Sequence, residues 1–423
     1  MSWARSSTGL GSRPGAPGGA YGKLAPVRRW GTGPAEVPKS LLRRAFARNS
    51  VLRQLDWVLL AAVLALSLFG TLLVWSATEA SLRERGSDPR TYLYKQLINI
   101  IIGLALFLGV MLLKPRHLRT YAPVLYGVSL LGLLAVFTPL GISVNGSKSW
   151  INLHLPGGNE IEPSEFGKLA VILMAAVFLS GMRQASGRPT MRAVAMTLVM
   201  AAVPLALVVK EPDLGVTILV LVMVLGLIAL SGIKLRWLVL GTGAGALSVL
   251  AVFRLHLLKA YQLGRLTAFF HPDANPLGSG YSAAQAKLAI GSGGLFGQGL
   301  FHGSLITGNF VPNQDTDFIF TVAGDELGFI GAAVIIALLA LLLLRALRIA
   351  TRADDQFGML VASGIAIWFA VQSFINIGMT IGIMPVTGLP LPFVSYGGSA
   401  MFADMIAIGV LQVVHRHQFI FRG

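Results

Sequence analysis

Ten apolar segments, each long enough to cross a lipid bilayer, dominate the sequence from residue 57 onwards. A transmembrane α-helix needs about 20 predominantly apolar residues. Charged residues make up only 12% of the chain, about half of the roughly 25% that is usual in soluble domains. The sequence therefore predicts an all-α polytopic integral membrane protein. The expected spans are residues 57–76, 97–113, 121–139, 164–182, 193–209, 214–231, 237–257, 317–344, 357–381 and 399–414.

Basic residues are distributed unevenly between alternate connections, and this predicts the orientation. An excess of Lys and Arg marks the cytoplasmic side. The N-terminal segment and the connections after spans two, four, six, eight and ten hold 23 Lys and Arg, whereas the other connections hold nine. Both termini are therefore expected in the cytoplasm, with a large extracytoplasmic loop at residues 258–316. The net charge of +16 reflects this topology and does not indicate nucleic acid as a partner.

Residues 1–54 precede the predicted membrane domain, residues 55–423. They are rich in Gly, Pro, Ser and Arg, and they carry ten Lys and Arg against one acidic residue, Glu36. This composition predicts a disordered basic cytoplasmic tail and not a signal peptide. The tail either only sets the orientation or also contacts anionic lipid or a cytoplasmic partner. Because the chain contains no Cys, disulfides and thiolate sites are excluded.

Ionisable residues within or beside the spans are candidates for function, because a charge in the membrane is unfavourable unless it faces the protein interior. Glu165 and Lys168 are three residues apart, so they share one helix face and can neutralise each other. They form either a structural ion pair or part of a cavity lining. Asp317 is a candidate at the start of span eight, whereas Asp325 is expected to be structural.

Two outer segments are irregular. The loop at residues 258–316 contains Arg265, Asp273 and Asn275, and its Gly-rich stretch 283–303 is expected to re-enter the membrane or lie at its interface. Residues 376–399 hold three Pro and five Gly before span ten. Residues 395–399 then lead into the start of a helix, where free N–H groups suit an anion such as pyrophosphate. A simple helix break explains this composition equally well.

Several ordered motifs resemble one known family. They are Pro163-Ser164-Glu165-Phe166-Gly167-Lys168, Pro212-Asp213-Leu214-Gly215, Pro276-Leu277-Gly278-Ser279-Gly280-Tyr281, Thr316-Asp317-Phe318-Ile319-Phe320, Glu326-Leu327-Gly328 and the segment 376–399, together with Asn145-Gly146 through Trp150. From about Asp56 to the C-terminus the chain resembles the RodA and FtsW proteins of shape, elongation, division and sporulation. Residues 289–299 look more like RodA than FtsW.

This resemblance implies a peptidoglycan glycosyltransferase that polymerises lipid II for cell elongation and shape. Polymerisation joins the 4-hydroxyl of an acceptor GlcNAc to the anomeric carbon of a donor MurNAc and releases undecaprenyl pyrophosphate. One inversion of configuration needs a carboxylate general base and no covalent intermediate. Glu165, Lys168, Arg265, Asp317, Ser395 and Ser399 are the expected substrate-binding residues. The leaving pyrophosphate needs cations or oriented N–H groups, which Lys168, Arg265 and the turn at residues 395–399 could supply.

The position that holds the general base in relatives, usually an Asp before Pro-Leu-Gly, is Asn275 here. An amide does not accept a proton at neutral pH. Three explanations are open: Asp273 acts as the base instead, Asn275 is an engineered inactivating change, or the chain is a natural paralogue with weak or no polymerase activity. The catalytic candidates are therefore Asp273 and the position of Asn275.

The resemblance also implies partners in the bacterial cell membrane, namely a class B penicillin-binding protein and other membrane proteins of the elongation complex. Two other functions stay open: a lipid II flippase, and a non-catalytic scaffold for a transpeptidase. No cofactor is required by the sequence. Asp273, Asp315 and Asp317 could hold Mg²⁺ or Mn²⁺ with substrate phosphates, or could only solvate the loop and cap span eight.

Overall fold

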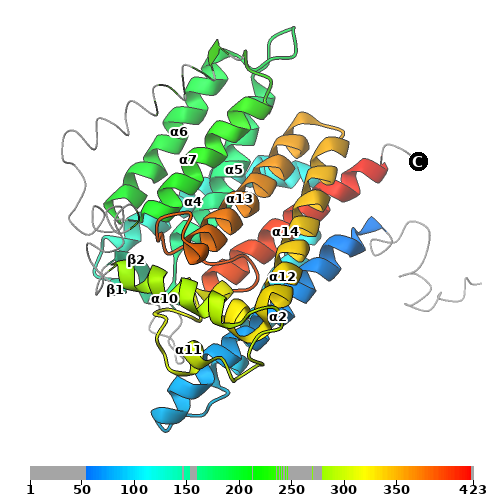
Figure 1. Ribbon diagram of the computed structural model, residues 1–423. Helices are drawn as coiled ribbons and strands as arrows, with labels where there is room; N and C mark the ends of the chain where they lie inside the picture. The colour runs from blue at the N-terminus through cyan, green and yellow to red at the C-terminus, as the bar shows by residue number, and fades with distance from the viewer. Residues whose placement is uncertain are drawn as a thin grey trace, which may run out of the picture. The chain divides into compact units, whose positions relative to one another are not determined.

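Helices dominate the computed structural model, which describes residues 54–144, 147–152, 160–211, 213–234 and 279–420, with single positions between 236 and 245 and Phe269. Most of them run side by side (Figure 1). In chain order these are α2 (Trp57–Glu84), α3 (Thr91–Met111), α4 (Pro115–Val136), α5 (Pro163–Gly181), α6 (Met191–Lys210), α7 (Leu214–Leu230), α10 (Ser279–Ser292), α11 (Ser304–Thr307), α12 (Ile319–Arg352), α13 (Gln356–Ile381) and α14 (Gly398–Ile420).

The described helices match nine of the ten expected spans. Eight of them are long and apolar enough to cross a membrane, and α7 is a shorter apolar helix of 17 residues. Most of the expected seventh span, residues 237–257, lies outside the described residues, as do the basic segment 1–53 and most of residues 258–278, including Arg265, Asp273 and Asn275. We call the two ends of the helices outer and inner, after the expected orientation.

Polar residues at helix starts fix where the spans begin. The side chain of Asp213 accepts a hydrogen bond from the N–H of Val216 at 2.9 Å, and Asp355 accepts one from Gly358 at 3.1 Å. Such caps satisfy N–H groups that a helix itself leaves free. Pro115 and Pro163 occupy first-turn positions of α4 and α5, where the missing N–H of proline does no harm.

A small antiparallel sheet between α4 and α5 was not expected from the sequence. It contains β1 (Gly141–Val144), β2 (Ser147–Asn152) and β3 (Glu160–Ile161), in that order. Ile142 pairs with Trp150, and Ile151 pairs with Ile161. The sheet, α10 and α11 lie at the outer end of the helices (Figure 1), so this end carries most of the irregular structure.

The Gly-rich stretch expected at residues 283–303 is helical in its first half, as part of α10, and then runs along a break in α12. Gly328 has a φ of 67° inside α12, and a Cβ atom there would lie 2.3 Å from the backbone nitrogen of Gly297. The N–H of Phe329 bonds to the carbonyl of Gly294 at 2.9 Å. The side chain of Asp325 accepts bonds from Ser292 and Gln298 at 2.6 and 2.9 Å, which agrees with the structural role expected for it.

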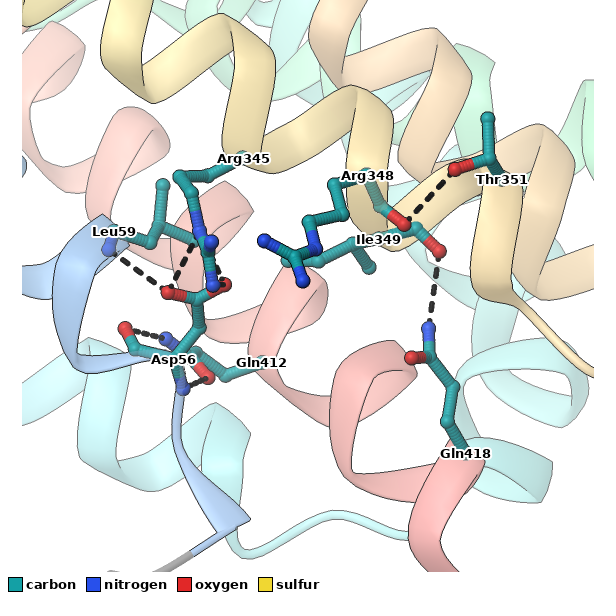
Figure 2. A network of polar contacts seen from close by, with 8 residues as sticks. All are labelled: Asp56, Leu59, Arg345, Arg348, Ile349, Thr351, Gln412 and Gln418. Carbon is teal, nitrogen blue, oxygen red and sulfur yellow. Dashed lines mark hydrogen bonds and ion pairs between the residues drawn. The ribbon is translucent and has the colours of Figure 1, made fainter.

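At the inner end, one polar network joins the start of α2 to α12 and α14 (Figure 2). The Asp56 carboxylate pairs with the Arg345 guanidinium at 2.6 Å. The side-chain amide of Gln412 accepts from the N–H of Asp56 at 3.0 Å and donates to its carbonyl at 3.1 Å. Nearby, Gln418 donates to the carbonyl of Ile349 at 3.0 Å. We call Asp56, Arg345 and Gln412 the inner network.

Candidate functional site

The connection between α13 and α14, residues 382–397, packs among the helices at the outer end, and we call it the proline loop. Its carbonyl groups are held by amides of α13. Gln372 donates to the carbonyl of Pro390 at 2.8 Å, and Asn376 donates to that of Leu389 at 2.7 Å. The second N–H of Asn376 bonds to the carbonyl of Asp317 at 2.8 Å. Irregular backbone is tolerated at membrane depth only with such partners.

The second half of the proline loop is fixed by Ser395. Its hydroxyl donates to the carbonyl of Thr316 at 2.6 Å and accepts from the N–H of Leu391 at 2.7 Å. The N–H of Tyr396 bonds to the carbonyl of Asp315 at 2.9 Å. Ser395 therefore shapes the loop and joins it to the start of α12, and direct contact between this hydroxyl and a substrate stays a prediction.

Phe393 adopts a φ of 63° within the same loop, although its side chain is buried. A left-handed conformation is strained for a residue with a bulky side chain and persists only when its surroundings enforce it. Its N–H bonds to a carboxylate oxygen of Asp404 at 3.3 Å. On the neighbouring residue, the carbonyl of Val394 would lie 2.4 Å from a Cβ at Gly70. The loop is thus pressed between α2 and α14.

A buried ion pair lies directly behind the proline loop. The ammonium group of Lys168 is 2.7 Å from the Glu165 carboxylate, and the two side chains are 0% and 1% exposed. Lys168 also donates to the side-chain oxygen of Gln372 at 2.9 Å, and its nitrogen lies 4.8 Å from the ring centre of Trp368. The indole of Trp368 donates to the same Gln372 oxygen at 2.7 Å. Lys168 is therefore enclosed by protein and coupled through Gln372 to the loop.

Several carboxyl groups lie close to the single cation Lys168. Burial, the charge of Glu165 and the charge of Asp213 raise the pKa of Glu162 well above its ordinary value. Asp404 also interacts electrostatically with Glu165 and Lys168. Oε1 of Glu165 and Oδ1 of Asp404 are buried without a hydrogen-bond partner among the described residues. Buried groups of this kind are uncommon in proteins and are typical of functional sites.

Ser399 connects this cluster to the start of α14. Its hydroxyl accepts from the N–H of Glu162 at 3.0 Å and lies 3.5 Å from the carbonyl of Glu160. Ser164 donates to the Glu162 carboxylate at 2.8 Å. The expected start of the last helix at residues 395–399 is thus found at Gly398, where α14 meets α5 and β3.

The structure brings together five of the residues predicted for the site: Glu165, Lys168, Asp317, Ser395 and Ser399. The side chains of Glu165 and Lys168 are both enclosed by the protein. Of the two interpretations left open for the pair, its enclosure favours an ion pair within the protein over a cavity lining. Arg265, Asp273 and Asn275 lie outside the described residues. Sequence reasoning did not single out Glu162 or Gln372, although a Gln within an apolar span is a usable signal.

Metal ligands are sparse around the two acids that can be placed. Burial raises the pKa of Asp315, and a carboxylate oxygen of Asp317 would lie 3.5 Å from a Cβ at Gly388. Within the described parts of the chain, no three His, Cys, Asp or Glu side chains are grouped so that they could hold a metal ion. Asp273, the third acid suggested for such a site, is not among the described residues.

On the other face of α5, an apolar groove of about 350 Å³ opens between α4, α5 and α14. Its lining is almost entirely aliphatic and aromatic. The groove is lined by Leu125, Val128, Ser129 and Gly132 of α4, by Pro163, Phe166, Leu169, Ala170 and Leu173 of α5, by Ala403 and Ile406 of α14, and by Ile151 and Ile161 of the sheet. Because Ile161 and Pro163 flank Glu162, the outer end of the groove adjoins the carboxylate cluster.

These features define a polytopic membrane protein with a buried lysine–carboxylate cluster, a proline loop fixed above it and an apolar groove beside it. The chain belongs to the FtsW/RodA/SpoVE family of cell cycle proteins, whose family model matches residues 56–419. It is a multi-pass protein of the bacterial cell membrane. The family resemblance noted from the sequence is confirmed.

The similarity to individual proteins extends over most of the chain. Peptidoglycan glycosyltransferase MrdB of Escherichia coli (strain K12) is 37% identical over 368 residues, which cover 86% of this chain and 94% of that protein. The probable peptidoglycan glycosyltransferase FtsW of Trichlorobacter lovleyi is 37% identical over 372 residues, which cover 88% of this chain and 94% of that protein.

Solved structures of family members are also similar to this chain over most of its length. A chain in a peptidoglycan synthase complex superimposes with a TM-score of 0.72 at 31% identity, covering 86% of this chain and 98% of that chain. The rod shape determining protein RodA of Thermus thermophilus superimposes with a TM-score of 0.63 at 30% identity, with the same coverage. The MrdB and RodA matches support the RodA side of the resemblance.

Proposed function

We propose that this chain is a peptidoglycan glycosyltransferase that polymerises lipid II. The observation that carries the proposal is the apolar groove, whose outer end adjoins the buried polar cluster, and this cluster is in turn bonded to the proline loop through Gln372. This arrangement suits an amphiphile with a long apolar tail and a charged head. Relatives that match more than four-fifths of the chain are named as peptidoglycan glycosyltransferases, which supports the same activity.

In this proposal, the groove between α4, α5 and α14 receives the prenyl tail of lipid II. Its lining offers almost no polar group, so a hydrocarbon chain binds there without leaving buried polar atoms unpaired. At the outer end of the groove, Glu162 and Ser399 mark the change from apolar to polar surroundings. The head group is then directed towards the proline loop and the outer surface.

Lys168 supports the site from behind in this mechanism. It is already neutralised by Glu165 and bonded to Gln372, so its main effect is to hold Gln372 and, through it, the proline loop. The start of α14 at Gly398 and the predicted contribution of Arg265 remain the candidates for pyrophosphate binding, because N–H groups at a helix start and a guanidinium both favour phosphate oxygens.

The general base is proposed to lie in the loop that contains Asp273 and Asn275. Inversion at the anomeric carbon needs one carboxylate that accepts the proton of the acceptor hydroxyl. Either Asp273 takes this role, or Asn275 holds the acceptor by hydrogen bonds without accepting its proton. Catalysis of this kind contributes roughly a hundred- to ten-thousandfold in rate.

Purified protein incubated with lipid II in detergent tests the function, because polymer can form there whereas transport cannot be observed. We expect Asn275→Asp to raise polymerisation at least about a hundredfold, with Asp273→Ala in that background changing little. If the unmodified chain is already active and Asp273→Ala abolishes polymer, Asp273 is the base. Polymerisation that survives Asp273→Ala in the unmodified chain would contradict both assignments. No polymer from any variant, with transport in vesicles, would favour a flippase.

For partners, we infer a class B penicillin-binding protein that docks on α12. The likeness to a peptidoglycan synthase complex supports this inference. Phe329 and Leu344 of α12 are 67% and 64% exposed, which offers an apolar face within the membrane. Residues 361–369 of α13 do not offer such a face, because Val361 and Phe369 are fully buried.

A photo-crosslinking residue at Phe329 should capture a single-span transpeptidase in native membranes. The same residue at Val199 of α6, which is 68% exposed, is the matched control and should not. Equal capture at both positions, or none at Phe329, would contradict docking on α12.

A further inference from the structure

A cavity of about 410 Å³ lies at the inner end of the helices, opposite to the end that holds the proline loop. It is formed where α3 ends, α4 begins and α14 makes its last turns. Residues 112–116, Val413, Arg416 and His417 line it. None of these residues takes part in the site described above, so the cavity needs an explanation of its own.

Among the described residues that line this cavity, three are cations and none is acidic: the cations are Lys114, Arg116 and Arg416. Arg416 donates through Nη1 to the carbonyl of Met111 at 2.8 Å, which fixes the guanidinium at the cavity. Its Nε–H is buried and has no hydrogen-bond partner among the described residues. A buried donor without a partner is unfavourable, so an acceptor bound at this point would be stabilising.

The start of α4 adds to the positive potential. Lys114 precedes the helix, and Pro115 is its first residue. The N-terminus of a helix carries a partial positive charge, which favours phosphate oxygens. The ligand that matches this wall of the cavity is therefore an anion with several oxygen acceptors.

The other wall of the cavity is apolar and faces outward. Leu112 is 86% exposed, and Leu108, one helical turn before it, is 56% exposed. In a protein that spans a membrane, such side chains contact acyl chains. A ligand that satisfies both walls carries an anionic head and a hydrocarbon tail, which a soluble phosphate or an acidic peptide does not.

We propose that this cavity binds the head group of an anionic phospholipid in the inner leaflet. The phosphate lies between Lys114, Arg116 and Arg416, and an acyl chain runs along Leu112 and Leu108. Basic pockets between transmembrane helices bind lipid head groups by this chemistry. The N-terminal segment of the chain is not a competing occupant, because it holds ten Lys and Arg against Glu36 alone.

Lipid binding by the purified, delipidated full chain tests the proposal. Native mass spectrometry would follow binding of tetraoleoyl cardiolipin, with dioleoyl phosphatidylcholine as the neutral probe. We expect Lys114→Gln/Arg116→Gln to weaken cardiolipin binding roughly ten- to thirtyfold. Both side chains are exposed, so the variant should fold. The control is Arg188→Gln/Arg192→Gln, which removes the same charge from exposed positions at the same end and should leave binding within about threefold.

Several results would overturn the proposal. Equal cardiolipin affinity in the cavity variant and the control would show that only general surface charge attracts the lipid. Phosphatidylcholine bound as tightly as cardiolipin would show that the cavity does not recognise the negative charge of the head group. Displacement of cardiolipin by millimolar inorganic phosphate would assign the cavity to a free anion, and displacement by polyglutamate would assign it to an acidic peptide.

Discussion

Among the described residues, the ion pairs Asp56–Arg345 and Glu165–Lys168 differ in what surrounds them. At the inner end, the Asp56 carboxylate receives the guanidinium of Arg345, and its backbone is bonded on both sides by Gln412. At the outer end, Lys168 faces Glu165 with further carboxylates nearby, and one oxygen of Glu165 and one of Asp404 are left without a hydrogen-bond partner among the described residues. The inner region pairs one carboxylate with one cation, whereas the outer region has more carboxyl groups than cations.

This difference indicates that the inner pair is structural and that the outer cluster belongs to a functional site. The Asp56–Arg345 pair and Gln412 join the start of α2 to α12 and α14, and a structural ion pair of this kind is by itself weak evidence of function. A buried cluster with more carboxyl groups than cations is unfavourable, because burial and mutual repulsion hold some of these groups in the protonated form, and it persists where activity requires it. Two further features that are typical of functional sites, the strained backbone of Phe393 and the apolar groove, also lie at the outer end.

The largest effect is expected from Lys168→Met, which leaves Glu165 buried without its cation. Loss of one partner of a buried pair destabilises by about 3–5 kcal/mol, so thermal stability in detergent should fall sharply. Lys168→Met/Glu165→Leu removes both charges and should recover stability to within about 1 kcal/mol of the unmodified protein. Polymerisation of lipid II by this double variant should stay about a hundredfold lower.

Lys234→Met is the control, because Lys234 is exposed at the inner end and its loss should change neither stability nor activity. Full activity in the stable double variant would show that the lysine–carboxylate pair is as purely structural as the inner network. The distinction between a structural inner pair and a functional outer cluster would then be wrong.

Local sequence periodicity accounts for what could be predicted here. Glu165 and Lys168 are one helical turn apart, so their pairing follows from the helix alone. Gln372 bonds to Lys168 across 204 residues, and no spacing rule reveals such a contact. The sheet at residues 141–161 was missed because its strands are only two to six residues long. Helix ends were misjudged for a similar reason, since α2 continues to Glu84 beyond the apolar part that marks a span.

A smaller effect is expected at the inner network from Arg345→Met. Asp56 keeps the N–H of Leu59 as a partner at 3.0 Å, and Arg345 is partly exposed to solvent, so the loss should be about 2 kcal/mol. The measurement is the melting temperature, together with lipid II polymerisation per folded molecule, which should not change. Arg348→Met, an exposed neighbour drawn in Figure 2, should alter neither. A selective loss of activity in Arg345→Met would give the inner network a functional role.

The carboxyl groups at the outer end also predict that the stability of the fold depends on pH. Burial, and then the charge of Asp213, raise the pKa of Glu211 to about 8. A carboxyl group whose pKa is raised on folding favours the folded state at low pH, and this contribution is lost as the pH rises towards 8. Between pH 5 and 8 the unmodified protein should therefore lose about 2 °C or more in melting temperature relative to Glu211→Gln. Glu84→Gln, at an exposed position, should show the same dependence of melting temperature on pH as the unmodified protein. If Glu211→Gln also shows that same dependence, Glu211 is not the group responsible.

The smallest effect is expected from Ser399→Ala, and it distinguishes a structural serine from one that binds substrate. The hydroxyl accepts from the N–H of Glu162 at 3.0 Å, and one such bond contributes about 1 kcal/mol. Stability should fall by about that amount, and the KM for lipid II should rise less than about threefold, because the hydroxyl is already used within the protein. Ser395→Ala, which loses two bonds of the proline loop, should cost about twice as much stability. A tenfold rise in KM for Ser399→Ala at unchanged melting temperature would instead show that Ser399 contacts the substrate, as the sequence predicted.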